Sequence, residues 1–273
     1  MPAPKLLGMD TNQEYSSRVV LVTGGTKGIG KGIAEAFLQA GATVVVCGRQ
    51  QPEQLPSAAG RKAEFIACDV REAQAVKDLV TQVHERHGRL DVLVNNAGGA
   101  PAVDSATVSP RFHEGVLRLN LFSTLHASQA ANAVMQQQES GGVIVCIGSI
   151  SALRPSPGTA AYGAAKAAVL SLVSSLAVEW APKVRVVAVS PGLVRTEQSH
   201  LHFGDEAGIA SVAQTIPAGR LAEPQDIADA CVFVASSKAS YMSGSNLLLH
   251  GGGERPAFLG AANSDQAHQP QAK

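Results

Sequence analysis

The sequence predicts an α/β fold in which helices cover both faces of a doubly wound parallel sheet. Short runs of β-branched and other apolar residues alternate along the chain with longer segments of helical pattern. The apolar runs are nearly continuous rather than alternating, which is typical of parallel strands that are buried on both faces. Strands that alternate with helices and are joined by right-handed crossovers form such a sheet. With 273 residues and 45% hydrophobic side chains, the chain is long enough for a single domain of this kind.

The expected strands follow the apolar runs in chain order. They are Val19–Thr23, Thr43–Cys47, Glu64–Ala67, Val92–Asn95, Val143–Ile147, Val184–Val189 and Asn246–Leu249. The helical patterns predict helices over Gly28–Ala40, Glu72–His87, Pro110–Gln138, Ala160–Trp180 and Gln225–Ser236. The predicted sheet therefore has seven strands.

The chain divides into one folded domain and two terminal segments. Residues 1–17 are expected to form an N-terminal extension and residues 18–252 the single domain. Residues 253–273 are rich in Gly, Ala, Gln and Pro, and we expect them to form a flexible tail.

Two internal segments depart from the regular alternation. Arg49–Arg61 holds Pro52 and Pro56 where a crossover helix is expected, so that helix is predicted to be short or missing. Val194–Gly219 is longer than most connections in compact domains, and such loops are often mobile lids. The alternative is a fixed helical loop that packs against another subunit.

Composition excludes several classes of function. The 22 basic and 22 acidic side chains cancel, which argues against broad capture of nucleic acid or anionic membrane. We expect no apolar stretch long enough to span a membrane and no secretory signal in Met1–Ser17.

The cysteines and histidines do not indicate a metal site. The four cysteines lie inside apolar runs without metal-ligand spacing, which predicts buried free thiols and a reducing cytoplasm. His200 and His202 lack further ligands and are interpreted as solvated loop residues. Exposed loop positions are likewise the favoured interpretation of Arg154 and Arg195, with recognition of an anionic substrate as the alternative.

A glycine-rich turn follows the first strand and precedes the first helix. This arrangement aims backbone N–H groups and the positive end of the helix dipole at a pyrophosphate, and glycine permits the close approach. A turn that only joins strand to helix is the alternative. The residues predicted to bind cofactor here are Gly24, Thr26, Lys27, Gly28, Ile29 and Gly30.

The end of the second strand indicates which dinucleotide binds. A carboxylate at this position would hold the ribose 2′-hydroxyl of NAD. The sequence instead has Arg49, with no acid until Glu53, and Lys27 supplies a second cation. The two positions together favour NADP over NAD, although either residue alone could be a solvated surface cation.

The remaining motifs resemble those of the short-chain dehydrogenase/reductase family. They are Asn95-Asn96-Ala97-Gly98 after the fourth strand, Asn120, Ser149 after the fifth strand, Tyr162 with Lys166, and Pro191-Gly192 after the sixth. With the glycine motif they occur in the order of the family, over about residues 18–252. The resemblance implies a Rossmann-type sheet of order 3-2-1-4-5-6-7.

The chemistry of Tyr162 and Lys166 agrees with this resemblance. The two residues are four apart and share one helical face. A free tyrosine has a pKa of about 10, and a neighbouring ammonium is expected to lower it. Tyr162 would then act as acid for carbonyl reduction and as base for alcohol oxidation. The Ser149 hydroxyl would hydrogen-bond the substrate oxygen.

The resemblance assigns further roles. Asn120 would hold a water that relays protons toward Lys166, and Lys166 would bind the cofactor ribose. Asp69 would accept from the adenine amino group, with helix capping as the alternative. The other residues that the resemblance places at the cofactor are Val70, Asn96, Ala97, Gly98, Pro191, Gly192, Val194 and Thr196.

The expected function is interconversion of a carbonyl and a secondary alcohol with NADP(H). The nearest resemblance is to 3-oxoacyl-carrier-protein reductases, but Ala133–Ser140 and Ala167–Ala181 lack the basic residues that would dock an acidic carrier. A free small molecule or a coenzyme A ester is the other possibility. A catalytically idle NADP-binding regulator is the alternative of another class. We expect a homo-oligomer, a tetramer or dimer, because Ala160–Trp180 is apolar on most faces.

Overall fold

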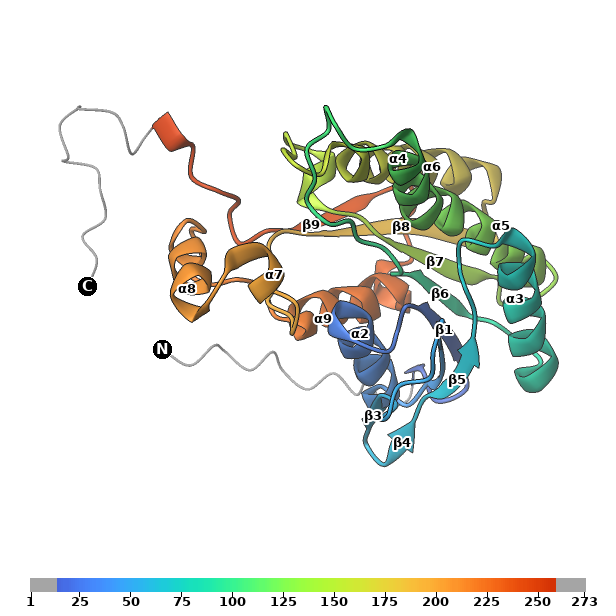
Figure 1. Ribbon diagram of the computed structural model, residues 1–273. Helices are drawn as coiled ribbons and strands as arrows, with labels where there is room; N and C mark the ends of the chain where they lie inside the picture. The colour runs from blue at the N-terminus through green and yellow to red at the C-terminus, as the bar shows by residue number, and fades with distance from the viewer. Residues whose placement is uncertain (1–13, 259–273) are drawn as a thin grey trace.

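The computed structural model describes residues 14–258 and contains the predicted parallel sheet. Its seven strands run in the order β5-β2-β1-β6-β7-β8-β9 (Figure 1). The strands are β1 Val19–Thr23, β2 Thr43–Gly48, β5 Glu64–Ala67, β6 Val92–Asn95, β7 Gly142–Ile147, β8 Val184–Pro191 and β9 Asn246–Leu249. Each matches a predicted strand within two residues at either end. The order reverses between β1 and β6, where α/β enzymes bind ligands at the carboxyl ends of the strands.

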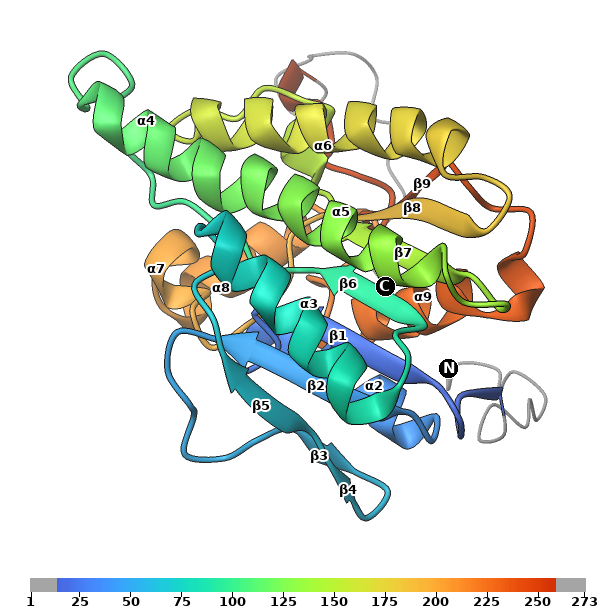
Figure 2. The same ribbon diagram turned by 90° about the vertical axis from the view of Figure 1, so that its right-hand side faces the viewer.

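Helices cover both faces of the sheet, as predicted (Figure 2). One face is covered by α2 (Gly28–Gln39) and α9 (Pro224–Ala235), which pack against each other. The other is covered by α3 (Ala73–His87), α4 (Pro110–Leu117), α5 (Ser123–Met135) and α6 (Ala160–Glu179). Each layer encloses its own cluster of buried aliphatic side chains.

The helix predicted over Pro110–Gln138 is not a uniform α-helix. It consists of α4 (Pro110–Leu117), a π-helical turn at Arg118–Phe122 and α5 (Ser123–Met135). The buried Asn120 lies in the π-helical turn, and its side chain bonds the loop after β6 rather than solvent. Such turns are common at functional sites. Hydrophobic periodicity alone does not reveal them.

The two segments that were expected to interrupt the regular alternation differ from each other in structure. Between β2 and β5 the chain forms a short antiparallel hairpin, β3 (Ser57–Ala58) with β4 (Arg61–Lys62), so the crossover helix is missing as predicted. The segment 194–219 is not irregular, because it contains α7 (His200–Phe203) and α8 (Glu206–Gln214). Asp205 caps α8 by accepting from the Gly208 N–H at 3.0 Å.

The helical segment 194–219 has a small apolar cluster of its own. Ile209, Ile216 and Leu221 are buried, and Phe203 packs against them. Ile209 is therefore not free to cover a substrate, because this side chain is already buried inside the segment. Leu201 is 67% exposed and remains free to contact a ligand.

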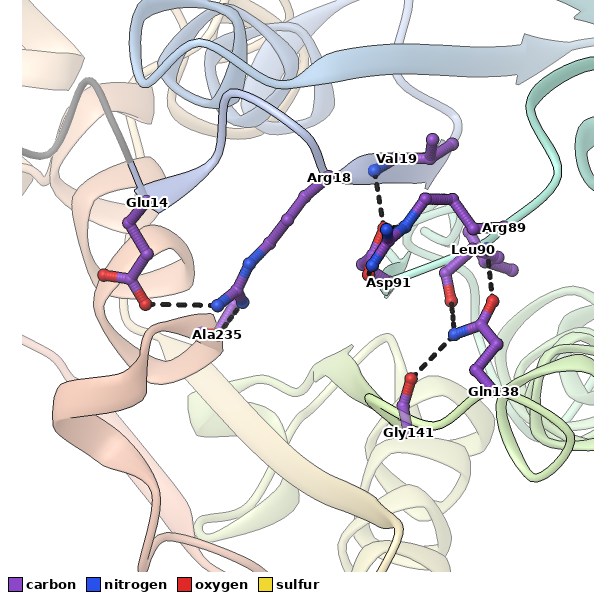
Figure 3. Close-up of polar contacts among 9 residues, drawn as sticks. All are labelled: Glu14, Arg18, Val19, Arg89, Leu90, Asp91, Gln138, Gly141 and Ala235. Carbon is purple, nitrogen blue, oxygen red and sulfur yellow. Dashed lines mark hydrogen bonds and ion pairs between the residues drawn. The ribbon is translucent and has the colours of Figure 1, made fainter.

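Part of the expected N-terminal extension is packed on the domain. Tyr15 is fully buried, and its hydroxyl donates to Val232 O at 2.7 Å. Arg18 donates to Glu14 and to Ala235 O, each at 3.4 Å (Figure 3). Residues 14–17 therefore anchor the chain to α9. Residues 1–13 and most of the expected tail, 259–273, lie outside the described residues.

The amino ends of the strands are joined by buried polar contacts. The Asp91 carboxylate accepts from the Val19 N–H at 2.8 Å and from Arg89 Nε at 2.8 Å. Gln138 accepts from the Leu90 N–H at 2.8 Å and donates to Leu90 O at 3.0 Å. Figure 3 shows these contacts between β1, β6 and the end of α5. They stabilise the edge of the sheet opposite to the ligand-binding edge.

Helix α6 contradicts the expectation that no stretch is apolar enough to cross a membrane. By length and composition its 20 residues could cross a membrane, and 39% of an apolar 18-residue stretch of the helix is buried within one chain. The core helix of a globular protein can have the same length and composition, and α6 packs on β8 with Lys166 directed into the protein. Its outer face includes Val178, which is 81% exposed.

Candidate active site

A cavity of about 910 Å³ lies at the carboxyl edge of the sheet, over the reversal of strand order. This volume falls in the range typical of ligand sites. Sixteen of the twenty predicted site residues line it: Gly24, Thr26, Lys27, Gly28, Ile29, Gly30, Arg49, Asp69, Val70, Asn96, Ala97, Gly98, Tyr162, Lys166, Pro191 and Thr196. The structure therefore brings together motifs that are up to 172 positions apart in the sequence, from Gly24 to Thr196.

Four predicted residues do not line this cavity. Ser149 and Asn120 are buried behind its wall, at 8% and 0% exposure. Gly192 packs so closely on His250 that a Cβ would lie 2.9 Å from the His250 Cα. Val194 bridges to Ala222 on the way into α7. Each of the four lies within two positions of a residue that lines the cavity.

Two glycines of the turn exclude a side chain, each for a different reason. Gly28 has a φ of +51°, which side chains rarely adopt. A Cβ on Gly30 would clash with Gly24 O and with Asn96 Nδ2. Helix α2 has no acidic residue in its first turn and no side-chain cap. Its first N–H groups are therefore free for an anion, which fits the predicted pyrophosphate site.

Thr23 is a residue of this site that the sequence reasoning missed. Its hydroxyl accepts from the N–H groups of Asn96 at 3.0 Å and Ala97 at 3.1 Å. Asn96 in return donates to Thr23 O at 2.9 Å and to Gly24 O at 3.1 Å. These bonds lock the ends of β1 and β6 together. The signal was present, since Thr23 is the first residue of the glycine motif.

The adenosine end of the cavity contains paired and unpaired charges. Asp69 is ion-paired with Arg71, and the Arg71 side chain and backbone lower the pKa of this carboxyl. Its oxygens thus already accept hydrogen bonds from Arg71, which leaves them less available for the expected bond to an adenine amino group. Within residues 14–258, Arg49 and Lys27 form no salt bridge, although both line the cavity. The sequence reasoning did not single out Arg71.

The catalytic end combines Tyr162 and Lys166 as expected from their spacing. Lys166 is 3% exposed, donates to Ile147 O at 2.8 Å, and places Nζ 5.6 Å from the centre of the Tyr162 ring. Burial lowers the pKa of Lys166 from 10.5 to about 8. Burial raises the pKa of Tyr162, and a hydrogen bond with Ser149 acts in the opposite direction.

The direction of the Tyr162 shift corrects the expectation from sequence. We expected the ammonium to lower the pKa of the phenol, but loss of hydration at Tyr162 outweighs the stabilising contacts. The phenol is therefore neutral across neutral pH and is a proton donor.

Ser149 and Asn120 lie behind the cavity wall and form hydrogen bonds with residues that line the cavity. The Ser149 Oγ accepts from the Ser151 N–H at 3.1 Å and bonds Tyr162. The Asn120 side chain accepts from the Gly99 N–H at 2.8 Å and donates to Val116 O and Gly99 O. Both amide protons of Asn120 are thus used within the protein, which leaves one lone pair of its Oδ1 for the expected relay water.

The remaining candidates lie apart from this chemistry. Among residues 14–258, no group of three His, Cys, Asp or Glu side chains is placed to hold a metal ion. Arg154 is ion-paired with Glu254 at 2.7 Å, and Arg195 with Glu206 at 2.9 Å. The four cysteines are free and buried, as predicted.

Comparisons with known proteins agree with this geometry. The family described as "Enoyl-(Acyl carrier protein) reductase" matches residues 24–254. A 3α-hydroxysteroid dehydrogenase of Mediterraneibacter gnavus is 35% identical over 244 residues, 86% of this chain and 96% of that protein. A probable 2,4-dienoyl-CoA reductase of Bacillus subtilis is 34% identical, with the same coverage of both chains. The ligand-free aldohexose dehydrogenase of Thermoplasma acidophilum has a TM-score of 0.82 and 31% identity, covering 90% of this chain and 96% of that one.

The chain belongs to the short-chain dehydrogenase/reductase family. As an oxidoreductase of this family it uses a nicotinamide cofactor. The cavity fits that group, because Gly28 and Gly30 keep the start of α2 open to a phosphate and Tyr162 lines the same cavity. The family resemblance and the predicted fold are confirmed.

Proposed function

We propose that this oxidoreductase interconverts a carbonyl compound and a secondary alcohol with NADP(H). The observation that carries the proposal is one continuous cavity. Lys27 and Arg49 line it at the glycine loop and the end of β2, and Tyr162 and Lys166 line it on α6. The same cavity therefore holds both the cations that would bind a phosphate and the group that would donate a proton to a carbonyl oxygen.

The choice of NADP is supported by the charge balance at the adenosine end. Arg71 is ion-paired with Asp69, whereas Arg49 and Lys27 form no salt bridge among residues 14–258, and the charge of Arg49 acts on Asp69 only at longer range, where it helps to lower the pKa of that carboxyl. A 2′-phosphate adds about two negative charges and would pair with Arg49 and Lys27. A 2′-hydroxyl would leave both cations without a partner.

Tyr162, Ser149 and Lys166 each have a different role in the proposed reaction. The bound cofactor supplies or accepts the hydride. Tyr162 donates the proton to the carbonyl oxygen in reduction, and its neutral state at pH 7 suits this role. The Ser149 hydroxyl orients the same oxygen, and Lys166, held by Ile147 O, binds the cofactor ribose and places its charge beside Tyr162.

Two other functions compete with this proposal. The probable dienoyl-CoA reductase among the relatives supports reduction of an acyl-CoA or acyl-carrier-protein substrate. The absence of basic residues at Ala133–Ser140 and Ala167–Ala181 favours a substrate without an acidic carrier. A catalytically idle NADP-binding regulator is disfavoured because Tyr162, Lys166 and Ser149 are all present and in contact or close together.

Purified protein assayed for NADPH and NADH oxidation tests the proposal. The panel holds a 3-oxosteroid, a 3-oxoacyl-CoA, a small ketone and an enoyl-CoA. We expect turnover of a carbonyl compound with NADPH and much less with NADH. Reduction of the enoyl-CoA alone would favour the acyl-thioester alternative, and cofactor binding without any turnover would favour the idle regulator.

We also propose that the protein is a cytoplasmic homo-oligomer. Helix α6 has apolar residues on its outer face that the sheet does not cover, including the exposed Val178. A second copy would cover this face in a closed two-fold arrangement. Light scattering should give a dimer or tetramer at micromolar concentration, and Val178→Glu should shift the protein toward monomer. A wild-type monomer would contradict the proposal.

A further inference from the structure

The carboxylate of Glu197 lies at the mouth of the phosphate cradle. A Cβ on Gly28 would be 3.8 Å from Glu197 Oε1 and 3.9 Å from Oε2, so the carboxylate faces the glycine turn with both oxygens. Glu197 also lines the cavity with Thr196 and Gln198. It comes from the first turn of the 194–219 segment, far along the chain from Gly28.

This carboxylate has no counter-charge of its own. Among residues 14–258, no salt bridge or hydrogen bond involves the Glu197 carboxylate, whereas Glu206 in the same segment is paired with Arg195. The start of α2 is positive, because its dipole ends there and its first N–H groups have no side-chain partner. Glu197 is therefore an anion next to the groups that the cofactor pyrophosphate would use.

We propose that Glu197 sets the affinity of the cofactor site by competing with the pyrophosphate for the start of α2. In the ligand-free protein the carboxylate compensates the positive helix end. When a dinucleotide enters, two negative phosphates meet this third negative charge, and the Glu197 side chain has to turn away. The inference rests on the proposed dinucleotide site, but not on the choice between NADP and NAD.

Glu197 belongs to the turn that leads into the neighbouring helical segment. The turn Thr196–Ser199 is closed by two side-chain bonds, from the Thr196 N–H to Ser199 Oγ at 2.8 Å and from the Gln198 N–H to Thr196 Oγ1 at 3.3 Å, and by a backbone bond from the Ser199 N–H to Thr196 O at 3.0 Å. Helix α7 begins at the next residue, His200, whose Nδ1 lies 3.1 Å from the backbone oxygen of Glu197. None of these bonds uses the Glu197 carboxylate, which can therefore turn away while the turn stays closed.

The variant Glu197→Gln tests this inference by binding rather than by turnover. It removes the charge and keeps the size of the side chain. Interaction of a charge with a helix end and with a nearby phosphate changes affinity by about threefold to tenfold at low ionic strength. We therefore expect E197Q to bind NADPH, NADH and inorganic pyrophosphate about threefold to tenfold more tightly, and to release NADPH more slowly. The gain should shrink at 1 M salt because the charges are then screened.

Two control variants test whether the gain in affinity depends on the position of the Glu197 charge or only on the loss of one negative charge from the protein. Glu179→Gln removes an exposed carboxylate at the end of α6, outside the cavity, and should leave all three affinities unchanged. Glu197→Asp keeps the charge and should stay within about twofold of wild type, far from the gain of E197Q.

Three outcomes would overturn the inference. They are equal affinities in E197Q and wild type, weaker binding in E197Q, or an equal gain in E179Q. If wild-type protein binds neither NADPH nor NADH, the proposed function fails instead. Tight dinucleotide binding that E197Q leaves unchanged would preserve that function and reject the role of Glu197.

Discussion

The Lys166 Nζ lies over the ring of Tyr162, 5.6 Å from its centre, while it donates a hydrogen bond of 2.8 Å to Ile147 O. The carbonyl at the end of β7 therefore fixes the ammonium beside the phenol. Lys166 is nevertheless almost fully buried, so its charge costs stability. The position of Lys166 beside Tyr162 and the stability lost by burying its charge together favour a role for this lysine in the proposed reaction rather than in stability.

Replacing Lys166 by Met should abolish activity and stabilise the fold at pH 7. The pKa of Lys166 is lowered from 10.5 to about 8, a difference that corresponds to about 3 kcal/mol of unfavourable burial of the charge. The lost hydrogen bond to Ile147 O offsets about 1.5–3 kcal/mol of this gain. We expect a net increase of about 1 kcal/mol in the free energy of unfolding, measured by chemical denaturation.

The pH dependence of this difference provides the control. Because the folded pKa is lowered, the unfolded state holds more protons between pH 8 and pH 10.5, so wild-type stability rises with pH across that window. K166M lacks this rise of about 1.4 kcal/mol per pH unit, so wild type should overtake it near pH 9. A difference that does not change with pH would show that Lys166 is not a buried charge.

Replacing Tyr162 by Phe should remove the proton donor and little else. General acid catalysis contributes about 10²–10⁴-fold, so turnover should fall by that factor. Cofactor affinity and thermal stability should stay near wild type. Tyr241→Phe is the matched control, because Tyr241 is fully exposed and its replacement should leave turnover intact. Retention of most activity in Y162F would remove Tyr162 from the mechanism.

The two reaction directions should respond oppositely to pH. Since burial raises the pKa of Tyr162, the phenol stays protonated at neutral pH and donates in reduction. Oxidation requires the phenolate, so its rate should increase as pH rises through 8 to 10. Reduction should decline above about pH 8, where Lys166 loses its charge. Initial rates measured from pH 6 to pH 10 in both directions check this, and parallel profiles would contradict it.

Sequence predicted the strands and the linear motifs well because both are local. The apolar runs of β1 to β9 and the spacing of Tyr162 and Lys166 need no tertiary information. The sign of the Tyr162 shift depends on burial by distant segments, which no spacing encodes. The π-helical turn at Asn120 is likewise accompanied by bonds to Gly99, in the loop after β6, 21 positions away in the sequence. Hydrophobic periodicity reveals neither the direction of the Tyr162 pKa shift nor the π-helical turn.

Replacing Arg49 by Asp should reverse the preference between the two dinucleotides. A charge-assisted hydrogen bond is worth about 1.5–3 kcal/mol, or roughly 10–100-fold in affinity. R49D should bind NADPH at least that much more weakly and should bind NADH equally well or better. Arg61→Asp, on the exposed hairpin strand β4, is the control and should change neither. A wild-type preference for NADH in a titration would make the assignment of NADP wrong.

The segment 194–219 should gain protection when ligands bind. Its apolar cluster around Ile209 makes α7 and α8 a packed unit, but Leu201 stays 67% exposed and Glu197 faces the phosphate cradle. Cofactor at the cradle and an apolar substrate against Leu201 would both act on the residues before α8. Closure of such a unit excludes water from the hydride path.

We therefore expect hydrogen exchange of residues 197–204 to slow with NADPH plus substrate, and exchange of residues 206–214 to change less. The hairpin at Ser57–Lys62 lies away from this segment and serves as an internal reference. Equal and strong protection of 197–214 with and without ligands would instead favour the fixed helical loop that packs against another subunit. In that case dilution to the monomer should increase exchange in the same residues, because the subunit contact that protects them would be lost.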